Sequence, residues 1–145
     1  MDFSSLMVSL AVASVWAVDE PTGQETRTGL DYSGLEGAVE ALFEAYPVAG
    51  QRQAEADFAG AYSLWMSGCG SACQFVTLIR LSDGEEMPGV TASEGMDWRV
   101  DSRLVIANPP AELALYGEVE LPGYLRPKCF VLNDDEAFEE IACGF

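Results

Sequence analysis

Four cysteines restrict the fold of this chain more than any other feature of its sequence. They are Cys69, Cys73, Cys129 and Cys143, in a chain of 145 residues. An even number of cysteines in a small exported domain indicates a disulfide framework before it indicates reactive thiols. Any fold of this chain must therefore bring these side chains together in pairs.

The pair that we expect first is Cys129 with Cys143. Both flank a predicted final hairpin, in which the turn residues 133–136 separate strands over 128–132 and 137–142. The two sulfur atoms would lie almost opposite each other across this hairpin. A bridge that encloses about fifteen residues contributes roughly 3 kcal/mol by the chain-entropy estimate.

Cys69 and Cys73 then pair with each other by default. Gly68 and Gly70 allow the positive φ angles that so short a covalent ring requires. The alternative pairings, Cys69–Cys129 with Cys73–Cys143 and the crossed version, remain open.

The segment Gly68–Cys73, GCGSAC, has two alternative interpretations, a redox centre and a metal site. A thioredoxin-type centre requires C-x-x-C at the start of a helix, whereas these cysteines are four apart and strand residues follow them. Two cysteines without histidine form a poor zinc ligand set. We expect no redox centre here, no metal site and no cofactor.

The N-terminal residues 1–17 resemble a signal peptide, with an apolar run that ends at Val15-Trp16-Ala17. The usual basic residues before this run are missing, and Asp2 stands there instead. Residues 18–32 are predicted to be a flexible lead-in, and residues 33–145 a single disulfide-linked domain. The expected location is the periplasm or the exterior of the cell, without membrane attachment after cleavage.

Charge and composition exclude several functions. The formal net charge is −17, from 24 acidic and 7 basic residues, and the chain has no histidine. Such a surface repels nucleic acids and anionic membranes, and it is compatible with a cationic protein as partner or with a small ligand. Without histidine, neither a Ser-His-Asp nor a Cys-His mechanism is available within this chain.

The hydrophobic pattern predicts an α+β fold that is mainly β. One N-terminal amphipathic helix is expected from Ser33, with a capping box to Glu36, and it must end before Pro47. This helix is expected to pack on one antiparallel sheet of about five or six strands. The predicted strands cover residues 61–67, 74–81, 96–100, 104–107, 128–132 and 137–142, and a further short strand is considered near Leu115.

Five residues are candidates for ligand contact. Asp101, Ser102 and Arg103 form one bend that places an acid, a hydroxyl and a guanidinium together, which is typical of a small anion site. Trp65 and Trp98 would form a binding platform if they were exposed. The simpler interpretation is that the bend residues cap their own turn and balance nearby acids, and that both tryptophans are core residues.

Four short motifs occur in order: Asp57–Tyr62 (DFAGAY), Gly68–Gln74 (GCGSACQ), Asp101–Val105 (DSRLV) and Asn108-Pro109-Pro110. In these motifs the chain resembles a family of uncharacterised exported bacterial proteins. The resemblance covers about residues 56–110 and implies an exported, mainly β domain of unknown role. It supplies no catalytic residue. Members commonly carry a histidine before the tyrosine, where this chain has Ala61, and they usually lack the last cysteine pair.

Three functions follow as hypotheses. The first is a small exported, non-enzymatic domain that binds a protein or a small ligand in the cell envelope. The alternative is a carboxylate-dependent hydrolase, or another enzyme, that uses Asp101 and Arg103, because paired acids work without histidine. The third is a purely structural module without a ligand of its own.

Overall fold

The computed structural model describes residues 31–117 and 121–145 and contains seven strands and two α-helices in these ranges. The predicted signal peptide, residues 1–17, and residues 18–30 of the predicted lead-in lie outside the described residues. In chain order the elements are α2 (Glu36–Glu44), β1 (Tyr62–Gly70), β2 (Cys73–Arg80), β3 (Glu86–Ala92), β4 (Met96–Trp98), β5 (Leu104–Ala107), α3 (Pro110–Leu113), the 3-10 turns η2 (Ala114–Tyr116) and η3 (Gly123–Leu125), β6 (Lys128–Leu132) and β7 (Phe138–Ile141).

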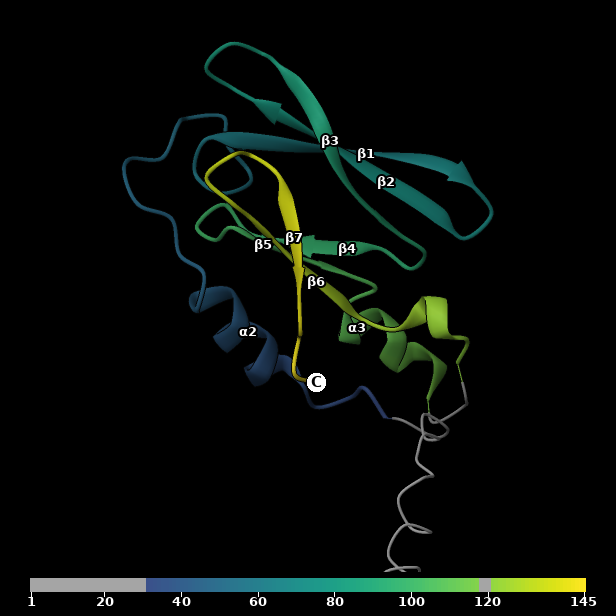
Figure 1. Ribbon diagram of the computed structural model, residues 1–145. Coiled ribbons are helices and arrows are strands. Elements are labelled where there is room, and N and C mark those ends of the chain that lie inside the picture. The colour runs from purple at the N-terminus through teal and green to yellow at the C-terminus, as the bar shows by residue number, and fades with distance from the viewer. Residues whose placement is uncertain (1–30, 118–120) are drawn as a thin grey trace, which may run out of the picture.

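The strands form two antiparallel sheets, with the orders β1-β2-β3 and β4-β5-β6-β7. In Figure 1 the three-stranded sheet lies at the top, the four-stranded sheet lies below it, and the helices lie at the bottom. The four-stranded sheet is therefore the middle layer of three. Its two faces are both covered, which explains why all four residues of β5 are buried.

Alternation along β5 and β6 sends side chains into two separate cores. Val105 faces the three-stranded sheet, whereas its neighbours Leu104 and Ile106 face α2. The first core contains Phe58, Ala59, Leu64, Val76, Leu78, Val90, Val105 and Leu132. The second contains Phe43, Leu104, Ile106, Cys129 and Val131.

The prediction of a mainly β, α+β fold is confirmed, but the single sheet of five or six strands is wrong. The strands divide into two sheets at the turn 93–95, between β3 and β4. Strand β3 was not predicted because Pro88 and Gly89 are poor strand residues. Both occur where the register of β2 with β3 shifts, and a side chain on Gly89 would collide with the backbone of Val76.

The helix α2 packs on the four-stranded sheet through its only fully buried residue, Phe43. It begins at Glu36, later than predicted, and the expected capping box is wrong. The amide and hydroxyl of Ser33 instead bond to the carboxylate of Asp31, at 2.9 and 2.8 Å. The strand considered near Leu115 is also wrong, since this residue lies in the 3-10 turn η2, directly after the second helix, α3.

Both disulfides join cysteines of the same hairpin. Cys69 and Cys73 close the end of β1 and β2, with 5.0 Å between their Cα atoms. Cys129 on β6 pairs with Cys143, which follows β7, at a Cα distance of 5.4 Å. These are the pairs expected first from the sequence. Among the described residues no helix is long and apolar enough to cross a membrane.

One charged network joins the two sheets. Glu136, in the turn between β6 and β7, accepts hydrogen bonds from Arg80 Nε at 2.9 Å and from the Tyr62 hydroxyl at 2.7 Å, and it also contacts Arg80 Nη2. These bonds lower the pKa of Glu136 to about 2. Burial and the bond to Glu136 raise the pKa of Tyr62 to about 12. The network fixes the β6–β7 turn against β1 and β2.

Glu136→Gln is expected to lower the melting temperature at pH 7, because it removes the charge that Arg80 neutralises. The pKa of Glu136 is about 2 in the folded protein against an ordinary 4.5, so the carboxylate stabilises the fold above about pH 4.5. That contribution is lost as the pH falls towards 2. The difference between variant and wild type should therefore shrink over this interval when thermal unfolding is followed by circular dichroism.

Glu85→Gln is the matched control, since this more exposed carboxylate lies 3.8 Å from the same guanidinium. Its effect should be smaller than that of Glu136→Gln. A Glu136→Gln deficit that stays constant from pH 7 to pH 2 would contradict the role given to this carboxylate.

Candidate functional site

Ser102 anchors the C-terminal end of α2. Its hydroxyl is buried and lies 2.9 Å from the carbonyl oxygen of Phe43 and 3.0 Å from that of Tyr46. It also accepts a hydrogen bond from the Leu104 amide at 3.2 Å. The carbonyls at the end of a helix need such partners. Ser102 thus caps its own bend through the Leu104 amide, as the simpler interpretation predicts, and it also caps a helix that lies far away in the sequence.

The side chain of Arg103 is directed at backbone carbonyls. Its guanidinium donates to the oxygen of Pro47 at 3.2 Å and to that of Leu132 at 3.0 Å. Asp101 is exposed and lines a cavity whose lining does not include Arg103. Ser102 and Arg103 therefore both hold the segment 43–47 at the end of α2, whereas Asp101 faces a cavity that Arg103 does not line.

The cavity beside Asp101 has a volume of about 520 Å³ and lies between α2 and the segments 47–52 and 99–101. The guanidinium of Arg99 lies 4.1 Å from the ring centroid of Phe43 and 2.6 Å from the Glu40 carboxylate, so its position is fixed. The charged residues that line the cavity are Glu40, Glu44, Arg52, Arg99 and Asp101.

The pKa of Asp97, a carboxyl close to this region, is raised. Burial is the main cause, and the nearby Arg99 opposes it. Asp97 lines a different cavity, of about 320 Å³, which shares Arg99 and Glu40 with the larger one. The described residues contain no group of three or more metal-binding side chains close enough to hold an ion.

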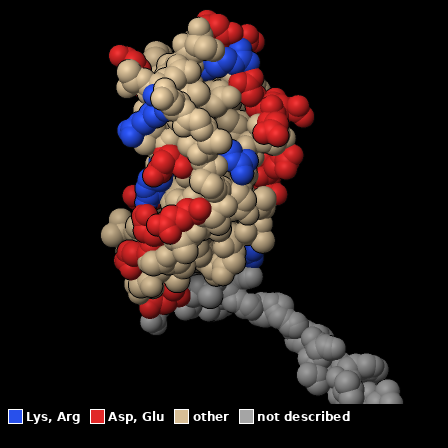
Figure 2. Space-filling model, turned by 90° about the vertical axis from the view of Figure 1, so that its left-hand side faces the viewer, with Lys and Arg blue, Asp and Glu red and all other residues tan. Residues whose placement is uncertain are grey.

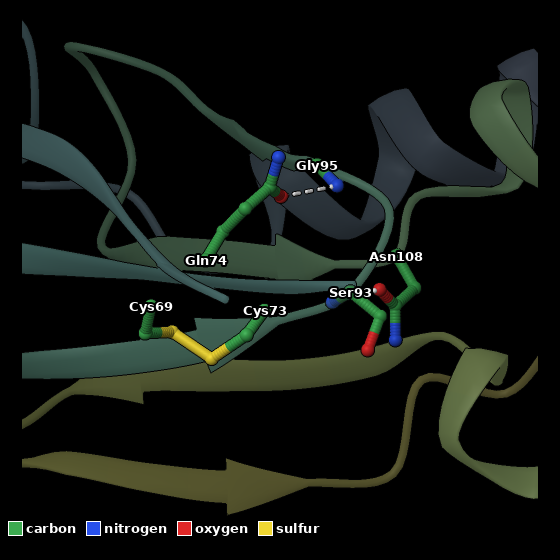
Figure 3. The surroundings of a disulfide bond; sticks show 6 residues. All are labelled: Cys69, Cys73, Gln74, Ser93, Gly95 and Asn108. Atoms are coloured by element: carbon green, nitrogen blue, oxygen red, sulfur yellow. Dashed lines mark hydrogen bonds between the residues drawn. A yellow bond between two sulfur atoms is a disulfide. The ribbon is translucent and has the colours of Figure 1, made fainter. Parts of the chain in front are cut away.

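The turn 93–95, which separates the two sheets, is held by two amide side chains (Figure 3). Gln74 Oε1 accepts a hydrogen bond from the Gly95 amide at 2.7 Å. Asn108 Oδ1 accepts from the amides of Ser93 at 2.9 Å and Glu94 at 2.8 Å. Gln74 follows Cys73 directly, so the end of the first hairpin and the end of β5 are fixed to the same turn.

The other end of the Asn108 side chain holds the segment before β6. Its amide nitrogen donates to the carbonyls of Tyr124 and Arg126, each at 3.0 Å. Asn108 is 2% exposed and has a φ of 56°. Asparagine is one of the few residues that adopt this left-handed conformation readily. The Asn108 side chain thus makes four hydrogen bonds to backbone groups of the protein, two as acceptor and two as donor.

Asp57, in the first of the four sequence motifs, holds the start of β1. Its carboxylate accepts hydrogen bonds from the Leu64 amide at 3.1 Å and from the Ser63 hydroxyl at 3.3 Å. The next residue, Phe58, is completely buried. Together with Gln74, Ser102 and Asn108, these residues give each of the four motifs a structural role.

The outer face of the three-stranded sheet carries the exposed aromatic residues of β1 and β2. Trp65 is 64% exposed and Phe75 is 36% exposed. Trp65 lies opposite Thr77 and Ser67 lies opposite Phe75, so the two aromatic side chains are diagonal neighbours. We call this surface the aromatic face; it consists of Ser63, Trp65, Ser67, Phe75, Thr77, Ile79, Glu86, Pro88 and Thr91, with Glu86 at its β3 edge.

The two tryptophans differ in whether they face the core or the solvent. Trp98 packs against the core between the sheets, as the simpler interpretation predicted. Trp65 points the other way, so the expectation that it is a core residue is wrong. Side chains alternate along β1, so Trp65 lies on the other face of the sheet from its buried neighbour Leu64. The sequence already contains this pattern. A hollow of about 410 Å³ lies beside Phe75, Thr77 and Pro88.

Compared with protein-family models, curated proteins and solved structures, the chain has no significant match.

Proposed function

We propose that this domain binds a cationic protein through its aromatic face. The observation that carries the proposal is the exposure of Trp65, which is 64% accessible beside Phe75 on a sheet face that no described element covers (Figure 1). Tryptophan is the residue type most enriched in the centres of protein interfaces. Exposed aromatic residues that form a group on a sheet indicate an interaction site.

Charge supports the choice of partner. The chain carries a net charge of −17, yet only Arg80, at the end of β2, is charged among the residues of β1 and β2. Figure 2 shows acidic side chains spread from one end of the domain to the other, with basic ones between them. An uncharged centre on a strongly acidic molecule favours a partner with an apolar patch and a basic periphery.

The alternative function, a carboxylate-dependent enzyme, has less support. Asp97 has the raised pKa that an acid catalyst needs, but Asp97 and Asp101 line different cavities. Arg103 is engaged by two backbone carbonyls. The geometry therefore favours binding over catalysis.

We also propose that the domain works in the periplasm or outside the cell, as an exported member of the family that its four motifs resemble. The two disulfides support an oxidising compartment. The structural roles of Asp57, Gln74, Ser102 and Asn108 explain why such motifs would occur together.

Trp65→Ala is expected to weaken binding of the cationic partner about 100-fold, as the loss of a central aromatic anchor does. The oxidised protein, immobilised, is incubated with the extracytoplasmic fraction of its host, and bound proteins are quantified by mass spectrometry. The partner is then purified and its dissociation constant measured. Raising the salt concentration should slow association, because the long-range attraction is screened.

Leu115→Ala is the matched control, because Leu115 is 82% exposed but lies in η2, outside the aromatic face. It should leave binding unchanged. Equal retention of every bound protein by wild type, Trp65→Ala and Leu115→Ala would overturn the proposed function.

A further inference from the structure

The four strands at the sheet edges differ in how they are protected against pairing with another chain. β3 contains Pro88 and a register shift, β4 has only three residues, and β7 carries two glutamates in four residues. Short strands, proline, bulges and charges are the usual ways in which proteins block their sheet edges. Three of the four edges are thus protected.

β1 has the least protection, since its one such feature is a register shift against β2 between Gly68 and Gly70, near the end of the strand. It is nine residues long, and its sequence, YSLWMSGCG, contains neither proline nor any charged residue. All residues from Trp65 to Gly70 are exposed. In a chain with 24 acidic residues, this is an unusual stretch of uncharged edge. Such a strand is a template for pairing with another strand.

The backbone groups of β1 show where a second strand has room. The amides and carbonyls of the even-numbered residues of β1 point away from β2. Two sets of bonds show this direction: Tyr62 bonds to Phe58, and the Leu64 amide bonds to Asp57. Beyond these bonds the edge is open. The Leu64 carbonyl, both backbone groups of Met66 and the Gly68 amide point along this edge and have no hydrogen-bond partner among residues 31–117 and 121–145.

We propose that β1 pairs with β1 of a second copy of this chain, antiparallel, with a two-fold axis between the two Met66 residues. The two Met66 residues then exchange both of their hydrogen bonds, and each Gly68 amide donates to the Leu64 carbonyl that faces it. This register uses the open groups named above. It also leaves the Leu64 amide on Asp57, where it is already bound at 3.1 Å.

The same register joins the aromatic faces of the two copies. Trp65 of each copy lies opposite Ser67 of the other, on the same side of the combined sheet, so the two tryptophans become diagonal neighbours. Two molecules of charge −17 repel each other, and β1 itself adds no charged side chain where the two backbones approach. The carboxylate of Asp57, which lies on this edge, is held at the Leu64 amide. This dimer does not depend on the proposed cationic partner.

The test is the mass of the purified, oxidised protein in sedimentation equilibrium, from about 1 to 500 µM, in about 20 mM or 500 mM sodium chloride. We expect a monomer–dimer equilibrium whose dissociation constant falls at high salt, since salt screens the repulsion. A monomer at every concentration and both salt levels overturns the proposal. Dimerisation that salt weakens also overturns it, because attraction between charges would then hold the copies together.

Met66→Pro and Met66→Ala separate backbone pairing from side-chain burial. Proline removes the amide on the open edge but leaves the bonds from β1 to β2, which the odd-numbered residues make. Its dimer dissociation constant should rise about 100-fold or more, whereas that of Met66→Ala should change less than about 3-fold. Equal dimerisation of Met66→Pro and wild type would place the interface elsewhere and overturn the proposal.

Hydrogen exchange on the wild-type protein gives a second readout that does not require a variant to fold. The amides of Met66 and Gly68 should exchange quickly in dilute, low-salt solution and slowly under dimer conditions. The Leu64 amide, which Asp57 already holds, should change little. Fast exchange of Met66 and Gly68 in the dimer would overturn the proposed pairing.

Discussion

Asn108→Ala is expected to lower the free energy of unfolding by about 3 to 4 kcal/mol. The substitution leaves the amides of Ser93 and Glu94 without their acceptor and the carbonyls of Tyr124 and Arg126 without their donor. It also places alanine at a φ of 56°, where a side chain with Cβ is strained. Urea unfolding of the oxidised protein, followed by circular dichroism, measures the change.

Asn133→Ala is the matched control. Asn133 Oδ1 also accepts two backbone amides, those of Asp135 at 2.8 Å and Ala137 at 3.0 Å, but in a solvent-exposed turn. Water replaces the lost bonds there, so the expected cost is below about 1 kcal/mol. Asn108→Gly relieves the backbone strain alone and should recover about 1 kcal/mol of the Asn108→Ala loss. Equal losses for Asn108→Ala and Asn133→Ala would contradict the role assigned to Asn108.

Removal of the second disulfide is the other change with a large expected effect. The double variant Cys129→Ala/Cys143→Ala opens a loop of sequence separation 14, which corresponds to about 3 kcal/mol in the chain-entropy estimate. Cys129 is fully buried beside Leu104 and Ile106, so the missing sulfur also leaves a cavity that adds to the loss. Urea unfolding under non-reducing conditions measures the total.

Cys69→Ala/Cys73→Ala is the comparison. Its loop has a sequence separation of only 4, and Cys69 is exposed at the end of the hairpin, so the expected loss is about 2 kcal/mol or less. The two variants should therefore differ by at least about 1 kcal/mol. A larger loss for the Cys69/Cys73 variant would show that the end of the first hairpin is more important for stability than its burial indicates.

Features that depend on nearby residues could be predicted from the sequence. The helix over 36–44, the final hairpin and the preferred cysteine pairing all follow from turn residues and periodicity within about fifteen positions. The exposed position of Trp65 could also be predicted, because alternation along β1 places Trp65 on the other face of the sheet from the buried Leu64. It was missed because tryptophan is more often buried than exposed.

Features that depend on distant residues could not be predicted. Ser102 contacts the end of α2, which lies 56 to 59 positions earlier, and nothing in the local pattern of the bend identifies that partner. The sequence presents Asn108 only as part of the Asn108-Pro109-Pro110 motif, although its side chain joins segments 14 to 18 positions away on both sides. The division into two sheets likewise depends on which faces pack together, and periodicity alone does not contain that information.

The order of the cysteines has a consequence for how the protein matures. Each bridge joins a cysteine to the next one along the chain, Cys69 to Cys73 and Cys129 to Cys143. A polypeptide that emerges from its N-terminal end into an oxidising environment thus completes the first bond before either later thiol appears. We therefore expect an oxidant alone to give both native bridges in refolding of the reduced protein, without an isomerase to correct mispaired intermediates.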